Sequence, residues 1–194
     1  ATDTAPLCGT YPKACHRKYF SQPVRNHMMH ETGLRILIRK VQLIAAQYDH
    51  ALIPILSYYH LHYFRIFFIM KKKQKKMVDE IQRQHQYIVF DKNDFKLLEI
   101  PEGNFAGPLW IGKLQDETIL KNIKTKNKLL KQLKEEMDIL GSYDVHMISK
   151  ELKIEVKVKK RDLLKKLNAT STHFNDHAVK TTYSIDKVKS FLNP

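Results

Sequence analysis

The chain has 194 residues, and 43% of them are hydrophobic, which is enough apolar material for one domain or two modest ones. Lys and Arg number 34 against 20 Asp and Glu, and the net charge of +14 indicates a polyanionic partner, either nucleic acid or an acidic membrane surface. Cys8 and Cys15 are too few for a four-ligand zinc site or a disulfide framework, and they fit a reducing, cytoplasmic setting.

The first residues, ATDTAPLCGTYPKAC, do not begin with Met and resemble interior sequence. They lack the basic start, apolar run and small-residue cleavage site of a secretory signal, so we expect none. A short Thr/Ala-rich lead into small residues and a proline is typical of a strand that ends at a pocket, where ligands of open α/β sheets bind. At such a rim the side chain of Asp3 could orient a polar ligand, with a turn-forming Asx residue as the alternative.

A helix and a strand pair are predicted next. Apolar residues recur at spacings of three and four over residues 26–48, which predicts a buried amphipathic helix with Asn26 as its cap. Residues 52–70 are rich in Ile, Tyr and Phe and favour two strands joined near His60 and Leu61. Because both halves are almost continuously apolar, we expect these strands to be buried on both faces, as in a helix-covered sheet.

A membrane span is the alternative for this apolar stretch, because a run of lysines follows it. Pro54, His60, His62 and Arg65 interrupt the stretch and argue against stable insertion into a membrane. We expect the lysine run to form an exposed turn that is either solvated or in contact with phosphate, and it comprises Lys71, Lys72, Lys73, Lys75 and Lys76.

The second half of the chain has a different composition. QYIVFDKNDFKLLEI predicts a hairpin that turns at Asp91 to Asp94, and PEGNFAGPLWIGKL predicts a structured loop. Residues 116–140 predict one long basic helix with an apolar stripe, ended by Gly141. Short helices near 145–152 and 157–167, an extended stretch and a final helix after Ser184 complete the chain. Helix, helix and ribbon in this order are similar to a winged-helix module, although the pattern is common.

The sequence offers little catalytic chemistry. It contains no G-x-G-x-x-G, no G-x-x-x-x-G-K-[ST] and no H-E-x-x-H, so neither common phosphate cradle nor that zinc motif is present. His60 and His62 could share a strand face and bind a metal, but structural or RNA-facing histidines are the preferred interpretation. Cys15 next to His16 does not in itself form a nucleophile and base.

Five separated blocks, in order along nearly the whole chain, resemble the tRNA guanosine-26 N2-dimethyltransferase family and in particular its archaeal members. They are TDTAPLCGTYPKACHRKY, PVRNHMMHETGLRILI, HYFRIFF, GPLWIGKLQDE and THFNDHAVKTT. The resemblance implies an α/β fold, with residues 1–76 as the C-terminal part of a Rossmann-like class I methyltransferase sheet. It implies an α+β tRNA-binding domain over residues 77–194, and S-adenosylmethionine-dependent mono- and dimethylation of the N2 amine of guanosine 26.

The resemblance also implies what the chain leaves to a partner. The family's Gly-rich cofactor loop, ribose-binding acid and Asp-Pro-Phe-Gly motif precede the TDTAPLCG block, and the sequence has none of them. We therefore expect a missing N-terminal methyltransferase half to carry the main S-adenosylmethionine motifs, and we assign no catalytic residue here. Many members carry a Cys-x-x-Cys zinc ribbon before the Gly-Pro-x-Trp block, but residues 82–107 contain no Cys, so we predict no metal.

The leading hypothesis, which rests on the resemblance, is that this chain supplies the tRNA-binding part and one rim of the active site of a tRNA guanine-N2 dimethyltransferase. The rim residues expected to line the pocket for the guanine base or the methionine end of the cofactor are Asp3, Thr4, Ala5 and Pro6. A non-catalytic basic RNA-binding protein is the alternative, and a peripheral membrane protein is a third possibility. Basic groups position the phosphate backbone, so we expect recognition mainly of tRNA shape. The residues expected to contact RNA are Arg17, Lys18, Arg25, Arg65, Lys71, Lys72, Lys73, Lys75, Lys76, Lys159, Lys160 and Arg161.

Overall fold

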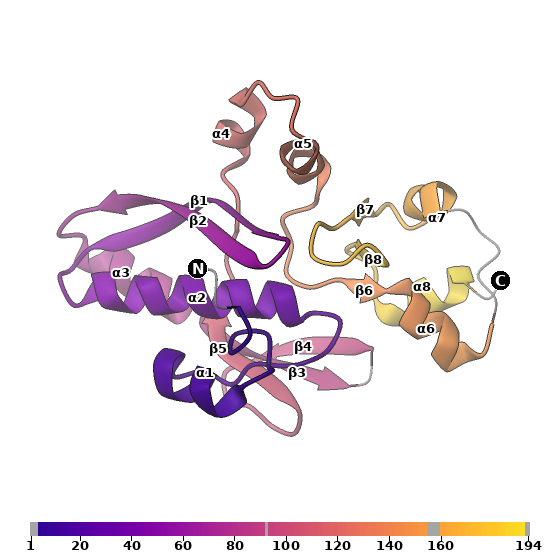
Figure 1. Ribbon diagram of the computed structural model, residues 1–194, viewed down its shortest axis with the longest axis horizontal. Coiled ribbons are helices and arrows are strands. Elements are labelled where there is room, and N and C mark those ends of the chain that lie inside the picture. The colour runs from indigo at the N-terminus through magenta and orange to yellow at the C-terminus, as the bar shows by residue number, and fades with distance from the viewer. Residues whose placement is uncertain (1–3, 92, 155–159, 193–194) are drawn as a thin grey trace.

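The computed structural model describes residues 4–91, 93–154 and 160–192, which fold as a mixture of helices and small antiparallel sheets (Figure 1). The first part of the chain is built around one long helix, α2. Its elements are α1 (Pro12–Tyr19), α2 (Met29–Ala46), β1 (Ala51–His60), β2 (Tyr63–Lys71), α3 (Lys75–Arg83), β3 (His85–Asp91), β4 (Asp94–Leu98) and β5 (Phe105–Trp110).

The second part consists of short elements. They are α4 (Glu117–Asn122), α5 (Lys128–Glu135), β6 (Tyr143–Asp144), α6 (Val145–Leu152), α7 (Lys160–Lys166), β7 (Thr170–Ser171), β8 (Ala178–Lys180) and α8 (Ile185–Leu192). In Figure 1 α4 and α5 project from the middle of the molecule, and β6 to α8 form a separate unit at the end opposite α3. We call β6 to α8 the C-terminal unit.

The predicted central helix and strand pair are confirmed, but Asn26 is not the helix cap. Its Oδ1 accepts a hydrogen bond from the amide of Met28, which is the N-cap residue of α2. α2 packs against β1 and β5, and β1 pairs with β2 in antiparallel register from Ala51 opposite Lys71 to His60 opposite Tyr63. The expectation that both strands are buried on both faces is wrong. Among the described residues these strands form a two-stranded sheet, and apolar side chains of β2 stay exposed, including Phe67 at 46% and Met70 at 48%. The sequence pattern shows that a surface is apolar but not whether another element covers it.

Residues 105–110 correct a second prediction. The hairpin of β3 and β4 is confirmed, but the predicted structured loop contains a strand, β5, that pairs with β3 in a sheet of order β4-β3-β5. Pro108 is tolerated because β5 is the outer strand of this sheet and Pro cannot donate a ladder hydrogen bond. The register is also irregular between Gln86 and Ile88, opposite the Gly107-Pro108 step. Glycine and proline suggested a loop, whereas pairing with β3 and packing on α2 produce a strand.

The predicted single helix over residues 116–140 is also wrong, because the chain forms α4 and α5 with extended residues around them. The side chains of Asp116 and Asn127 accept hydrogen bonds from the amides of Ile119 and Leu130, and each begins a new helix as an N-cap. Beyond α5 the carboxylate of Asp138 accepts hydrogen bonds from the amides of residues 114 and 115. These polar contacts hold the chain in an extended form that apolar spacing did not indicate.

The C-terminal unit agrees with its prediction. α6, α7 in its described part, the ribbon of β7 and β8, and α8 occur in the expected order. β6 joins the ribbon to form a small sheet of order β6-β8-β7. Its core contains Ile148, Leu163, Val179 and Val188, each no more than 2% exposed. The similarity to a winged-helix module stays a prediction.

The larger core surrounds α2 and unites it with β5, β3 and the N-terminal turn. Leu7, Leu34, Ile88 and Leu109 are fully buried within it. This core includes residues on both sides of position 76, where we expect the domain boundary. That boundary stays a prediction.

A buried charge network joins α2 to the C-terminal unit. Glu31, Arg35 and Lys180 are each only 1% exposed. One carboxylate oxygen of Glu31 lies 2.9 Å from Nη2 of Arg35, and the other accepts a hydrogen bond from Nζ of Lys180 at 3.1 Å. Lys180 also donates to the carbonyl oxygen of Ile139 at 2.6 Å, and the amide of Gly141 donates to Glu31 at 3.1 Å.

The network keeps Glu31 ionised. Burial by itself would raise the pKa of this carboxyl, but the cations of Lys180 and Arg35 and the amide of Gly141 outweigh burial and lower the pKa to about 2. Arg35 is held in place from the other side, because Nη1 donates to the carbonyl oxygens of Trp110 and Gly112. Three separate segments therefore meet at the Glu31 carboxylate, and Arg35 connects them to a fourth, residues 110–112.

We predict that Glu31→Gln lowers the free energy of unfolding by about 3 to 5 kcal/mol at neutral pH, because it removes the counter-charge of buried Arg35 and leaves Lys180 with only the carboxylate of Glu136 at 3.8 Å. The folded pKa of about 2 lies below the ordinary value of 4.5. The carboxylate's contribution is therefore complete above about pH 4.5 and is lost as the pH falls toward 2. Urea unfolding of both proteins across this range should show their difference shrinking.

Glu117→Gln serves as the control for that experiment, since Glu117 makes exposed ion pairs with Lys113 and Lys121 and such pairs contribute little. Adding Lys180→Met to Glu31→Gln should recover part of the loss, because it removes one buried cation. Equal unfolding curves for the wild type and Glu31→Gln would contradict the role of the network.

We predict that Gly33→Ala destabilises the fold by about 1 to 3 kcal/mol. A Cβ atom at this position of α2 would lie 2.9 Å from the carbonyl oxygen of Leu7 and 3.2 Å from Cζ of Phe64. Alanine is otherwise favoured over glycine inside a helix by about 1 kcal/mol. A lower free energy of unfolding for Gly33→Ala would therefore show that the close contacts outweigh this preference. Thermal unfolding measures it, with Ile44→Ala on the exposed side of α2 as a control expected to change stability much less.

Candidate RNA interface and pocket rim

The predicted pocket rim is a tight turn rather than the end of a strand, as far as the structure describes it. The amides of residues 8, 9 and 10 donate to the carbonyl oxygens of Thr4, Pro6 and Ala5 at 2.9, 3.3 and 3.0 Å. Asp3 lies outside the described residues. These hydrogen bonds hold the described rim residues in a compact turn, and their place at a pocket stays a prediction.

The turn lies where the start of α2 meets the tip of the β1–β2 hairpin. The hydroxyl of Thr4 lies 3.5 Å from the carbonyl oxygen of His62, to which it donates. Sγ of Cys8 lies 3.5 Å from Nδ1 of His30. The ring of His30 stacks on Tyr59 at a centroid distance of 3.9 Å and an interplanar angle of 10°. The rim is thus attached to a small polar and aromatic cluster.

The groups in this cluster are uncharged at neutral pH. Burial raises the pKa of the Cys8 thiol to about 11, and burial together with Cys8 raises that of Cys15 to about 12. Burial lowers the pKa of His30, which keeps its ring neutral. Neither thiol is a thiolate nucleophile, in agreement with the interpretation from sequence.

Sequence reasoning missed His30 and Tyr59. His30 stands in the first turn of a helix and Tyr59 stands within an apolar run, and both are common places for core residues. His30 is on α2 and Tyr59 is on β1, so they come from separate elements. No local spacing connects them, so only the packing of α2 on β1 reveals the cluster.

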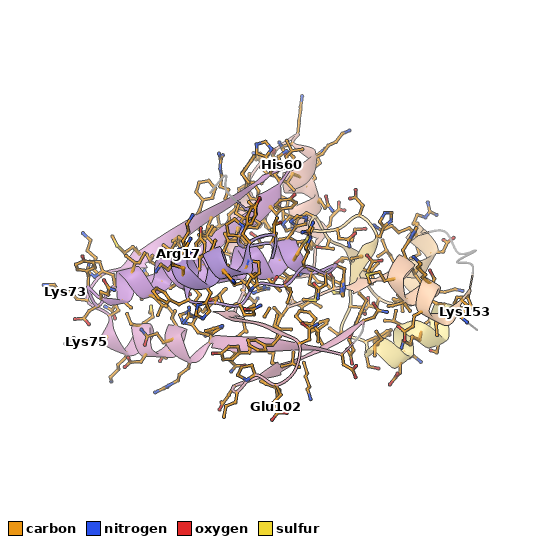
Figure 2. All side chains as sticks on the ribbon, turned by 60° about the horizontal axis from the view of Figure 1, so that its bottom comes forward. Arg17, His60, Lys73, Lys75, Glu102 and Lys153 are labelled. Carbon is orange, nitrogen blue, oxygen red and sulfur yellow. The ribbon has the colours of Figure 1, made fainter. Side chains whose placement is uncertain are left out.

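The described basic residues proposed for RNA contact are all exposed, but they do not form one patch. Lys71 ends β2, residues 72 and 73 form the turn that follows, and Lys75 and Lys76 begin α3. Figure 2 places Lys73 and Lys75 at one end of the molecule and Lys153 at the other. The predicted exposed turn is confirmed, with its last lysines in a helix.

The other candidates are distributed between these ends. Arg17 and Lys18 are on α1, and Arg25 is in the connection to α2. Arg65 projects from β2 with its guanidinium 5.4 Å from the ring of Tyr63. Lys160 and Arg161 begin α7 in the C-terminal unit, and Lys159 lies outside the described residues. Sequence reasoning did not identify Lys180, whose charge is buried in the network with Glu31.

The sequence raised two alternatives for the apolar stretch, a membrane span and a metal site at its histidines. His60 ends β1, and His62 lies in the exposed turn of the β1–β2 hairpin. Within the part of the chain that the structure describes, no three or more His, Cys, Asp or Glu side chains gather as a metal site would require. None of the described helices has the length and apolar character needed to cross a bilayer.

Comparisons with known proteins agree with this arrangement. A solved structure of Trm1 from Pyrococcus horikoshii in complex with S-adenosyl-L-methionine superposes with a TM-score of 0.88 at 37% identity, over 98% of this chain and 57% of that chain. This likeness confirms the α/β fold implied by the resemblance. It also shows that the arrangement of α2, the small sheets and the C-terminal unit occurs in a solved relative.

Curated relatives give the same result. The tRNA (guanine(26)-N(2)/guanine(27)-N(2))-dimethyltransferase of Aquifex aeolicus is 38% identical over 97% of this chain and 55% of its own length. The tRNA (guanine(26)-N(2))-dimethyltransferase of Pyrococcus horikoshii is 40% identical over 94% of this chain and 53% of its own length. The chain thus spans about half the length of these relatives. The family model for N2,N2-dimethylguanosine tRNA methyltransferase matches residues 1–193, and the chain belongs to this family.

Proposed function

We propose that this chain acts in the S-adenosylmethionine-dependent mono- and dimethylation of the N2 amine of guanosine 26 in tRNA, as the tRNA-binding part and one rim of the active site. The observation that carries the proposal is the family match over residues 1–193 together with the names of the relatives. The solved relative was in complex with S-adenosyl-L-methionine, which supports the cofactor. The net charge of +14 supports a polyanionic substrate.

The division of labour follows from the residues present. S-adenosylmethionine would supply the methyl group, and the motifs that hold it belong to the methyltransferase half that precedes the TDTAPLCG block in the family. In this chain Thr4, Ala5 and Pro6 border the pocket, with Asp3 proposed beside them. The N-terminal turn and the hairpin tip touch through Thr4 and His62, so the rim is held at one position relative to the RNA-binding surface.

We further propose that the other half docks on β2. Among the described residues β1 and β2 form a two-stranded sheet, so β2 is hydrogen-bonded along one edge only. Phe67, Ile69 and Met70 are 46%, 37% and 48% exposed along this strand, and exposed apolar side chains grouped together mark interaction surfaces. A methyltransferase half such as the relatives contain would extend the sheet and cover this strip.

The domain boundary after residue 76 and a cytoplasmic location, consistent with two free buried thiols, belong to the same proposal.

We predict that this chain binds tRNA with an affinity that falls steeply as salt increases, because each neutralised phosphate releases counterions. Replacing Lys72, Lys73 and Lys76 together by Ala should weaken binding and reduce the salt slope by up to about 0.9 per contact removed. Filter binding at several salt concentrations measures both. A flat salt response of the wild type would contradict RNA binding through the backbone.

A matched control removes lysines that already have an anionic neighbour. Lys113 and Lys121 lie 2.9 and 3.5 Å from the carboxylate of Glu117. Replacing both by Ala should alter tRNA affinity less than the triple change does. An equal loss from both variants would indicate a general charge effect instead of contact at the β2–α3 turn.

We predict that the chain alone does not methylate tRNA and that adding the methyltransferase half of a relative restores activity. The assay incubates unmodified tRNA with radiolabelled S-adenosylmethionine and locates the label at guanosine 26. Phe67→Ser with Met70→Ser should reduce this complementation at least tenfold without weakening tRNA binding, because the change removes the apolar strip of β2 and leaves the charge beside the lysine run unaltered.

Leu97→Ser is the control for that pair, since Leu97 is 40% exposed on β4, away from the β1–β2 sheet. Methylation by the chain alone would overturn the assignment of the cofactor motifs to another half. tRNA binding with no activity under any complementation would favour the alternative of a non-catalytic RNA-binding protein, for which the lack of a cofactor loop in the sequence is the supporting observation.

A further inference from the structure

The C-terminal unit contains a hollow that neither the rim nor the predicted basic residues explain. It has a volume of about 190 Å³ and opens between α6, α7 and the connection from β7 to β8. Its floor consists of Val145, Leu163 and Val179, which are 7%, 2% and 0% exposed. These side chains belong to the core of the unit. The floor is therefore apolar and held in place by packing on three elements.

The edge of the hollow is polar and aromatic. His146 of α6 and His177 of the β7–β8 connection are exposed, and their rings are in contact at a centroid distance of 4.2 Å and an angle of 35°. Across the opening, Nζ of Lys160 donates to the carbonyl oxygen of Asp176 at 2.6 Å. The carboxylate of Asp176 is the one acidic group among the lining residues.

Backbone hydrogen bonds hold this edge before any ligand arrives. The amide of Val145 donates to the carbonyl oxygen of His177 at 3.1 Å. The amide of His177 donates to Oδ1 of Asn175 at 2.9 Å, and Nδ2 of Asn175 donates to the carboxylate of Asp144 at 2.9 Å. Asp144 also accepts from the amide of Met147 at the start of α6. A ligand that binds here therefore orders few additional groups, which favours affinity.

The chemistry of the lining selects a class of ligand. An apolar floor with imidazole faces beside it suits a flat heteroaromatic ring, and the ammonium of Lys160 suits an adjacent phosphate. The volume is smaller than that of pockets for drug-sized molecules, which run from about 300 Å³ upward. A single base fits this description better than a larger ligand. The larger hollow between α4 and α5 is unsuitable for RNA, since Glu117, Glu135, Glu136 and Asp138 line it.

We propose that this hollow binds one unpaired base of the tRNA, with the base on the apolar floor and against the His146 and His177 rings, and with Lys160 at its phosphate. The proposal rests on the proposed function in that it takes tRNA as the ligand. It adds direct contact with a base to a surface otherwise expected to recognise backbone and shape.

The position of the hollow supports a path for the RNA strand. Asp176 also lines a second hollow, of about 270 Å³, with Tyr59 and His60 at the tip of the β1–β2 hairpin and Lys128 of α5. The two hollows therefore adjoin at Asp176 of the β7–β8 connection. A strand held in the first would pass over that connection toward the hairpin tip, whose turn contacts the pocket rim through Thr4 and His62.

The test combines changes in the protein with changes in the RNA. Fluorescence polarisation measures the dissociation constants of the wild-type chain and of the double variant His146→Ala/His177→Ala. Each protein is tested with an unmodified tRNA and with a set of tRNAs, each of which carries one abasic site at a different unpaired position. One abasic position should weaken wild-type binding roughly tenfold, the loss expected when one stacked base is removed. The double variant should bind intact tRNA roughly tenfold more weakly than the wild type does. Its affinity should not fall further when the tRNA carries that abasic site.

Controls separate this outcome from loss of folding and from charge. Met147 follows His146 on α6, is 46% exposed and does not line the hollow. Met147→Ala should therefore leave the affinity for tRNA unchanged. Lys160→Ala should weaken binding more than Lys153→Ala at the far end of α6. Circular dichroism and thermal unfolding confirm that the histidine variant is folded.

The outcomes are distinct. If the double variant shows the same abasic penalties as the wild type, or if no abasic position weakens wild-type binding, the base site is refuted while tRNA binding stands. If the double variant weakens binding equally for all the tRNAs and retains the abasic penalty, the histidines contact phosphate and the base site is again refuted. If the wild-type chain does not bind tRNA even at low salt, the proposed function itself fails.

Discussion

Glu31 is a buried carboxylate whose charge must be neutralised, and each group that neutralises it comes from a different segment. Arg35 follows one turn later on α2, Lys180 ends β8 in the C-terminal unit, and Gly141 lies in the connection between α5 and β6. An ionised carboxylate away from water is costly unless charge and hydrogen bonds compensate for it. The relative placement of α2 and the C-terminal unit is therefore constrained by electrostatics as well as by apolar packing.

A second polar set extends this constraint to the hairpin tip. Glu136 accepts hydrogen bonds from the hydroxyl of Thr172 at 2.7 Å and from Nδ1 of His173 at 2.7 Å. Nε2 of His173 in turn accepts a hydrogen bond from the amide of Tyr59 at 3.3 Å, which makes Nδ1 the protonated nitrogen. The ring of Tyr59 stacks on His30 beside the N-terminal turn. The N-terminal turn, the hairpin and the β7–β8 connection are thus linked by directional contacts, which the proposed role in positioning RNA would require.

The positions of the basic residues limit the kind of polyanion that could contact both ends of the molecule. Exposed lysines at the β2–α3 turn lie far from the C-terminal unit (Figures 1 and 2), so a polyanion that met both would have to be long. A folded tRNA, the substrate proposed above, meets this requirement, and in that proposal contacts with its backbone at separated points orient it before one base is selected. A base that is to be modified must leave its stack to enter a pocket. A surface with fixed contacts on both sides of the rim is suited to hold the RNA during that step.

The sequence by itself determined the elements whose signals are local. The apolar spacing of α2, the β-rich composition of β1 and β2, the Asp91 to Asp94 turn and the order of the C-terminal elements were all predicted, and the ordered blocks identified the family. Tertiary structure decided the rest. Residues 105–110 are a strand because β3 and α2 accept them, and residues 116–140 break into two helices because Asp116, Asn127 and Asp138 bond to distant or capping amides. Lys180, His30 and the histidine-edged hollow are likewise products of packing, since their partners are brought together by the folded chain and no spacing along the sequence encodes that proximity.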